Sequence, residues 1–142
     1  MSQAKVLSER ELRKVMLYCA AHPHAARNKA MLLMTHLAGM RVGEVAALRL
    51  ADVITSEGEI TNEVRLAAGQ TKGDRGRTVL IPERLRDELQ IYLRSRYGSA
   101  NLFAVCYESV GVALFPTQKH PRRGFSASTL TQYFHYLYKR CG

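Results

Sequence analysis

The chain has 142 residues, of which 46% are hydrophobic and 23% charged, an ordinary composition for one globular domain. Its longest mostly apolar stretch, residues 30–40, is too short to cross a membrane, and the charged N-terminus does not resemble a secretory signal, so we expect a cytoplasmic protein. The formal net charge of +9 makes a polyanion the expected partner and gives no reason to expect a membrane.

The basic residues are concentrated in the second half of the chain. Residues 1–64 contain 8 Lys and Arg against 7 Asp and Glu, whereas residues 65–142 contain 13 against 5. A surface tuned only for solubility is the alternative explanation, and the uneven distribution disfavours it. The three cysteines show no metal-binding spacing, so we expect reduced thiols, no metal and no cofactor.

Three helices are predicted in the first third of the chain, from Ser8 to His22, over 27–38 and over 42–48. Ser8 and Glu11 have the spacing of a capping box, in which each side chain accepts a backbone N–H of the other residue. The second segment is apolar on nearly all sides, which indicates a helix buried at the centre of the domain, and Gly39 should end it. A polar loop is expected over 52–58.

A hairpin and two more helices are predicted in the rest of the chain. The expected elements are strands over 60–68 and 77–81, a helix that begins at Pro82, and a last helix from about 128 to 141, for which Ser126 is the candidate N-cap. The segment 70–76 between the strands has the glycines and the aspartate of a turn, and it contains several cations. The whole arrangement predicts a mainly helical α+β fold, with helices packed around a small antiparallel sheet.

Arg41 stands where the third predicted helix begins. A helix N-terminus has unpaired N–H groups and a partial positive charge, and a guanidinium beside it can bind two phosphate oxygens at once. Glu44, three residues further on, could hold that guanidinium in position. The alternative, which the spacing by itself favours, is a surface ion pair worth about 0.2–0.5 kcal/mol.

The stretch around this arginine carries a family resemblance. Residues 35–49, Thr-His-Leu-Ala-Gly-Met-Arg-Val-Gly-Glu-Val-Ala-Ala-Leu-Arg, resemble the segment of tyrosine site-specific recombinases, the phage integrase family, that contains their first catalytic arginine. The resemblance implies that Arg41 binds the scissile phosphate of duplex DNA. It also implies that Glu44 is the supporting carboxylate of the family.

A second similarity lies in the predicted hairpin. Gln70-Thr71-Lys72-Gly73, followed by residues 77–82, is similar to the family's β-hairpin with its catalytic lysine. The resemblance implies that Lys72 protonates the departing 5′ oxygen when the phosphodiester is cut, a general-acid role that an ammonium group can fill. For Arg75 and Arg77 we favour simple contact with DNA phosphates or with water.

The basic loop before the last predicted helix is a weaker match to the family. Its cations, Lys119, Arg122 and Arg123, are predicted to contact DNA. Residues 120–123 fit His-x-x-Arg, but in the family this box follows the last helix, so we interpret them as phosphate contacts at most. The helix itself contains three tyrosines whose spacing favours packing in or near the core over a nucleophilic role, namely Tyr133, Tyr136 and Tyr138.

The resemblance covers about Ser8 to Gly142, and it implies a single, truncated integrase-like catalytic domain. The family's second arginine, its nucleophilic tyrosine and its N-terminal core-binding domain have no counterpart in these residues. We therefore expect a DNA integration and site-specific recombination protein that is inactive alone. The truncation should expose apolar faces of the helices over 27–38 and 128–141, which would favour a homo-oligomer.

Two other functions remain open at this point. A non-catalytic DNA-binding module, or a regulator that occupies a recombinase's site or pairs with it, would show the same basic charge. A partner-binding remnant with no DNA role ranks last, and its binding would lack the steep salt dependence of phosphate contacts.

Overall fold

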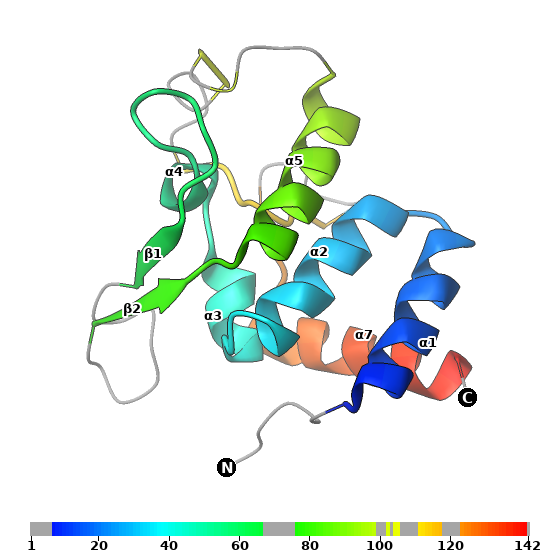
Figure 1. Ribbon diagram of the computed structural model, residues 1–142. Coiled ribbons are helices and arrows are strands. Elements are labelled where there is room, and N and C mark those ends of the chain that lie inside the picture. The colour runs from blue at the N-terminus through cyan, green and yellow to red at the C-terminus, as the bar shows by residue number, and fades with distance from the viewer. Residues whose placement is uncertain are drawn as a thin grey trace.

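The described part of the chain forms helices packed around a small hairpin. In the computed structural model, the described residues are 7–66, 76–98, 102, 104–105, 111–117 and 123–141. The elements, in chain order, are α1 (Glu9–Ala20), α2 (Ala25–His36), α3 (Val42–Ala47), α4 (Leu50–Val53), β1 (Glu63–Leu66), β2 (Arg77–Leu80), α5 (Glu83–Tyr97) and α7 (Ala127–Arg140) (Figure 1). The predicted mainly helical α+β fold is therefore confirmed.

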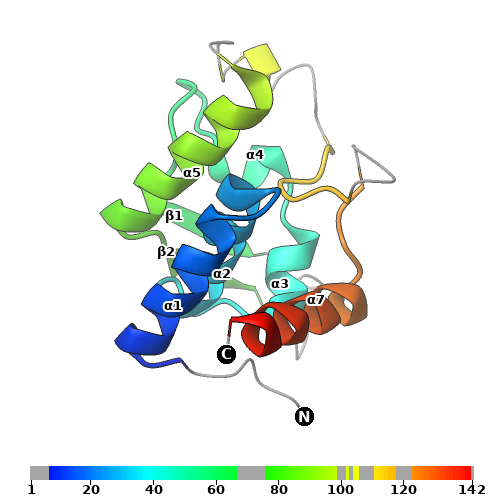
Figure 2. The ribbon, with the colours of Figure 1, turned by 90° about the vertical axis from the view of Figure 1, so that its right-hand side faces the viewer.

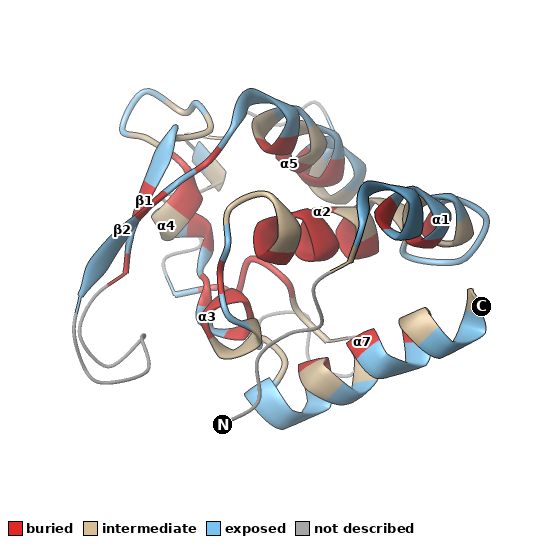
Figure 3. Cartoon of the chain, turned by 60° about the horizontal axis from the view of Figure 1, so that its bottom comes forward, coloured by how far each residue is buried: buried red, intermediate tan, exposed pale blue. Residues whose placement is uncertain are grey.

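The helix α2 lies at the centre of the molecule, as its apolar pattern predicts. The run from Ala30 to Met34 is fully buried, and α2 contacts α1, α3 and α5 (Figure 3). It begins at Ala25, two residues before the predicted start, because His24 adopts a left-handed backbone conformation with φ 63° and turns the chain into the helix. At the other end, Gly39 has φ +70°, a conformation that favours glycine, and the chain turns there towards α3.

The start of α1 follows the capping-box prediction. The backbone N–H of Glu11 donates to the Ser8 hydroxyl oxygen at 3.1 Å, and the Ser8 N–H donates to the Glu11 carboxylate at 3.0 Å. Both side chains therefore satisfy backbone groups that the first helical turn leaves unpaired. The buried face of α1 consists of Leu12, Val15 and Cys19.

The sheet is a single antiparallel pair, β1 with β2, among the residues that the structure describes. Glu63 lies opposite Leu80 and Leu66 lies opposite Arg77. The first strand is shorter than predicted at its start, because Ile60 instead pairs with Ile54 in an isolated bridge. The short helix α4 is a further difference from the predicted loop, and its two buried residues, Leu50 and Val53, anchor it to the core.

The last helix, α7, begins against α3 and ends beside α1 (Figure 2). Ser126 caps it by accepting the Thr129 N–H at 3.1 Å, as predicted. Its apolar stripe of Leu130, Phe134 and Leu137 is buried. The chain segment before the helix is held by an isolated antiparallel bridge between Pro116 and Gly124.

Gly124 should be intolerant of a side chain, because a Cβ there would lie 2.7 Å from the backbone oxygen of Ala46 in α3. We expect Gly124→Ala to lower the free energy of unfolding by about 1–3 kcal/mol, since backbone must shift to make room. Gly43 is the matched control: a Cβ there would meet Ala127 at an ordinary 3.5 Å. Urea denaturation should therefore show little loss for Gly43→Ala, and equal losses for the two variants would contradict this packing.

The expected exposed apolar surface is not found over 27–38 in the described residues, and over 128–141 only one large hydrophobic side chain that the structure describes, Tyr136, is exposed. The apolar run of α2 is buried, and so is the stripe of α7. The large hydrophobic side chains that are exposed come from four separate elements, and they are Leu17, Leu80, Ile91 and Tyr136. The structural reason for the predicted homo-oligomer is therefore wrong, and the oligomer itself stays a prediction.

No helix in the described ranges has the length and hydropathy of a membrane span.

Candidate functional site

Arg41 lies at the junction between the central helix and α3. It is the N-cap residue of α3, with extended backbone at φ −76° and ψ 152°, and its neighbour Met40 is buried. The Met40 N–H donates to the Met34 carbonyl at 3.1 Å, which ties the junction to the end of α2. The Arg41 side chain is exposed, and within the described ranges its guanidinium makes no hydrogen bond or ion pair. The charged guanidinium of Arg41 is thus exposed to solvent, on a backbone that hydrogen bonds hold in place.

Glu44 holds the backbone of Arg41 in place. Its carboxylate accepts the Arg41 backbone N–H at 2.9 Å, and its side chain is only 2% exposed. Two donors of Arg77 reach the same carboxylate: Nη2 lies 2.5 Å from Oε1, and Nε lies 3.2 Å from Oε2. This pairing is bidentate, the strong geometry for a guanidinium and a carboxylate. The hydrogen bond to Glu44 also raises the pKa of the Arg77 guanidinium.

The structure corrects two details of the sequence interpretation. Glu44 was expected to hold the guanidinium of Arg41, or else to form a surface ion pair with it, but the carboxylate is buried and binds the Arg41 main chain instead. Arg77 was expected only to contact phosphate or water. It is also the partner of Glu44, and its contact with phosphate stays a prediction. Sequence reasoning missed this pair because the two residues are 33 positions apart and meet only when the hairpin packs beside α3.

The bidentate pair joins the hairpin to the arginine site. Arg77 is the first residue of β2, and Leu66, opposite it, is the last residue of β1. The end of the strand pair that adjoins the connecting segment is therefore held at the start of α3, beside Arg41. Lys72 and Arg75, which belong to the segment that joins the two strands, lie outside the described residues.

The predicted basic loop is described only at its end. Lys119 and Arg122 lie outside the described residues, and so do His120 and Pro121. Arg123 is exposed, and its carbonyl accepts the Thr117 N–H at 2.9 Å. Gly124 packs on Ala46, near the end of α3. Arg123 therefore lies near the opposite end of α3 from Arg41.

The tyrosines of α7 serve mainly as packing groups, in agreement with the sequence interpretation for two of them. The Tyr133 hydroxyl accepts an N–H of Asn28 at 2.8 Å, and burial raises the pKa of Tyr138 to about 12. Tyr136 is more exposed than predicted, at 47%, with its ring stacked on Tyr133. A neutral, half-buried phenol is a poor nucleophile, so the geometry of Tyr138 favours packing.

The described residues also contain no candidate metal centre. No cluster of three His, Cys, Asp or Glu side chains occurs in the ranges that the structure covers. Cys19 is fully buried, and burial raises the pKa of its thiol to about 11, so the thiol stays protonated near neutral pH. Cys106 lies outside the described residues.

The fold and the site define a mainly helical α+β domain in which an exposed arginine stands next to a two-stranded hairpin. The model of the phage integrase family matches residues 5–142 of the chain. A crystal structure of XerA recombinase has a TM-score of 0.67 to it at 22% sequence identity, and the match covers 100% of this chain and 44% of that one. The chain belongs to the phage integrase family.

Curated relatives show the same family relationship. Tyrosine recombinase XerA of Thermococcus kodakarensis is 33% identical over 104 residues, which cover 73% of this chain and 34% of that protein. Tyrosine recombinase XerD of Rickettsia bellii is 28% identical over 100 residues, covering 68% and 32%. Transposase A from transposon Tn554 of Staphylococcus aureus is 28% identical over 99 residues, covering 68% and 26%. The matched part thus spans about a quarter to a third of each relative.

Proposed function

We propose that this chain takes part in site-specific DNA recombination, in which it binds duplex DNA with Arg41 at the scissile phosphate. The single observation that carries the proposal is the exposed guanidinium of Arg41 on a backbone that the buried Glu44 holds in place. A planar guanidinium can donate two parallel hydrogen bonds to a phosphate, and a fixed backbone reduces the entropy lost when it does so. The names of the relatives, two tyrosine recombinases and a transposase, support the same function.

The anchored hairpin supports a role for Lys72 as the general acid. Arg77 is fixed to Glu44, and Lys72 precedes it by five residues. An extended chain of that length spans at most roughly 17 Å. A flexible ammonium group within this reach can approach a phosphate bound at Arg41. We propose Arg75, Arg123, Lys119 and Arg122 as additional, non-catalytic phosphate contacts.

We also propose that the 142 residues do not cleave DNA by themselves. Strand exchange of the kind implied by the family resemblance needs a tyrosine that attacks the phosphate and forms a covalent link. By the family resemblance, neither that tyrosine nor the second arginine has a counterpart in residues 1–142, and the contacts of Tyr133 and Tyr138 in α7 favour packing. The chain would then supply one part of a site that other residues complete.

A suicide DNA substrate tests both halves of the proposal. The chain should bind duplex DNA with an affinity that falls steeply as salt is raised, because phosphate contacts release counterions. It should form no covalent protein–DNA adduct on a nicked substrate that traps such adducts. A covalent adduct formed by this chain alone would disprove the proposed inactivity. Binding that does not respond to salt would disprove the proposed phosphate contacts.

The second candidate function is a non-catalytic DNA-binding module or a regulator of a recombinase. The net charge of +9 favours it as much as it favours the first. In that case Arg41 would be one phosphate contact among many, and its replacement would lower affinity slightly without any further loss.

A further inference from the structure

Arg27 is a buried cation that the proposed DNA contacts do not use. It lies in the first turn of α2 and is 9% exposed. Its Nε and Nη2 donate to the side-chain oxygen of Asn28 at 3.2 and 3.1 Å. A buried charge costs free energy, and replacing buried ionic groups by apolar residues of similar volume is often neutral or stabilising. Stability alone therefore does not account for a guanidinium at this position.

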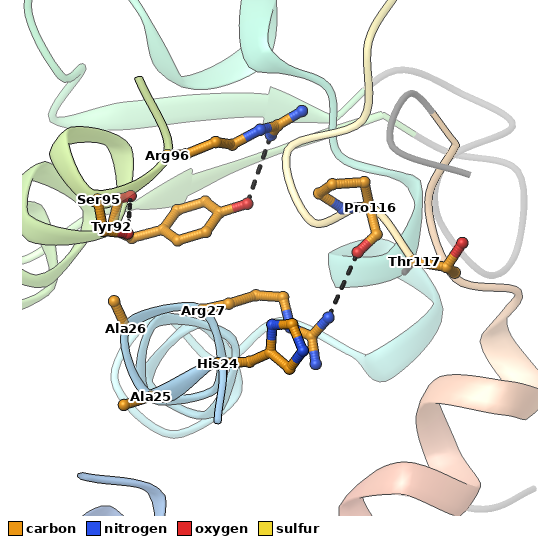
Figure 4. Close-up of a pocket in the computed structure, with 9 residues that line it drawn as sticks. All are labelled: His24, Ala25, Ala26, Arg27, Tyr92, Ser95, Arg96, Pro116 and Thr117. Atoms are coloured by element: carbon orange, nitrogen blue, oxygen red, sulfur yellow. Dashed lines mark hydrogen bonds between the residues drawn. The ribbon is translucent and has the colours of Figure 1, made fainter. Parts of the chain in front are cut away.

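The guanidinium of Arg27 reaches the segment that leads into the basic loop, residues 117–124. Its Nη1 donates to the carbonyl of Pro116 at 3.5 Å, and Figure 4 shows the side chain extending from α2 to this residue, near Thr117. The same segment is also held from α5, because the Tyr92 hydroxyl donates to the carbonyl of Leu114 at 2.5 Å. Two helices thus fix the chain where it enters the loop.

Arg27 also contacts the residues that follow the basic loop. Its guanidinium lies 5.2 Å from the centre of the Phe125 ring and 5.6 Å from that of Tyr133. These two rings are stacked, with their centres 6.1 Å apart. Asn28, which accepts from Arg27, donates in turn to the Tyr133 hydroxyl at 2.8 Å. Arg27 therefore connects α2 with the residues on both sides of the loop.

Arg123 is a cation of this loop that the structure describes, and its backbone lies between the two contacts of Arg27. The Arg123 carbonyl accepts the Thr117 N–H at 2.9 Å, and Pro116 pairs with Gly124 in the isolated bridge. The backbone is thus held on both sides of Arg123, whereas its side chain is exposed. A cation on a fixed backbone loses less entropy when it binds a phosphate.

We propose that Arg27 is a positioning residue for DNA binding, which fixes the backbone from which Arg123 contacts a phosphate and does not touch DNA itself. The inference rests on the proposed function, because it requires that the chain binds duplex DNA and that Arg123 is one of its phosphate contacts. This contact is separate from that of Arg41, which lies near the opposite end of α3. Loss of the buried Arg27 therefore removes a phosphate contact made by another residue.

The test is the salt dependence of binding to a labelled DNA duplex, measured by fluorescence anisotropy over a range of NaCl concentrations. The slope of log K against log[salt] decreases in magnitude by about 0.9 for each phosphate contact that is lost. Arg123→Ala should show this decrease, and Arg27→Met should show most of it. The double variant should lose little more than Arg123→Ala, because both changes remove the same contact. A merely structural loss would lower the folded fraction and leave the slope unchanged.

Two further variants complete the test. Lys29→Met, on the same helix, removes one positive charge and should leave the slope unchanged. Phe125→Leu removes the ring beside the guanidinium but keeps an apolar side chain, so it should also reduce the slope, and it decides the test if Arg27→Met does not fold.

The outcomes separate this inference from the proposed function. A wild-type slope in Phe125→Leu and in folded Arg27→Met would overturn the role of Arg27, and so would additive losses in the double variant or an equal loss in Lys29→Met. Binding of the wild-type chain that does not respond to salt would disprove the proposed DNA contacts, and the inference with them. An unchanged slope in Arg123→Ala would disprove the Arg123 contact and therefore this role of Arg27.

Discussion

Replacing Arg77 by alanine should destabilise the protein more than replacing its partner Glu44. Arg77→Ala leaves a carboxylate that is only 2% exposed without a counter-charge, and we expect a loss of about 3–5 kcal/mol. In Glu44→Ala, the remaining guanidinium is 43% exposed and can turn to water. That variant loses the Arg41 N–H acceptor and the pair, at a cost of about 1–2 kcal/mol. Urea denaturation of the two variants measures the difference.

Two controls make this asymmetry informative. The double variant Glu44→Ala with Arg77→Ala should be more stable than Arg77→Ala alone, since no buried charge is left unpaired. Arg49 and Asp52 provide a similar arrangement at the start of α4, with the Arg49 N–H bonded to the Asp52 carboxylate at 2.8 Å and a more exposed arginine. Arg49→Ala should cost less than about 1 kcal/mol. If Glu44→Ala were the more damaging single variant, the pair would not stabilise the site as described.

Replacing Arg41 by alanine should remove recombination chemistry while leaving DNA affinity nearly intact. The readout is rescue: the chain is mixed with a C-terminal fragment of a family relative that supplies the second arginine and the tyrosine. Loss of one donor that stabilises charge on a phosphoryl group costs about 10²–10³ in rate. Loss of one phosphate contact among several should weaken duplex binding by less than about tenfold. Lys72→Ala should likewise abolish the rescued cleavage.

Matched variants separate a positioned guanidinium from a general cation. Arg41→Lys keeps the charge but loses the planar fork, so it should recover affinity and little of the cleavage. Arg13, an exposed arginine on α1, should tolerate alanine in both assays. Full cleavage by the Arg41→Lys variant would contradict the need for a planar guanidinium at this position. Equal losses of affinity and cleavage in Arg41→Ala would favour the regulator over the recombination function.

Local patterns predicted most of the elements, and tertiary contacts account for the differences. The Ser8 capping box, the buried run of α2 and the Ser126 cap each depend on residues a few positions apart, and all are confirmed. The short helix α4 was missed because the polar stretch over 52–58, which overlaps its second half, predicted a loop, whereas Leu50 and Val53 are buried in the core.

For the candidate site, the sequence by itself determined which residue opens α3 and that a carboxylate follows three residues later. Helical spacing and the resemblance of residues 35–49 depend only on residues that are close together in the sequence, so packing of distant segments does not change them. Only the tertiary structure decided that Glu44 is buried and pairs with Arg77, and that Arg27 contacts both Pro116 and Phe125. The physical reason is that burial and ion pairing depend on which distant segments pack together, and no local periodicity encodes that.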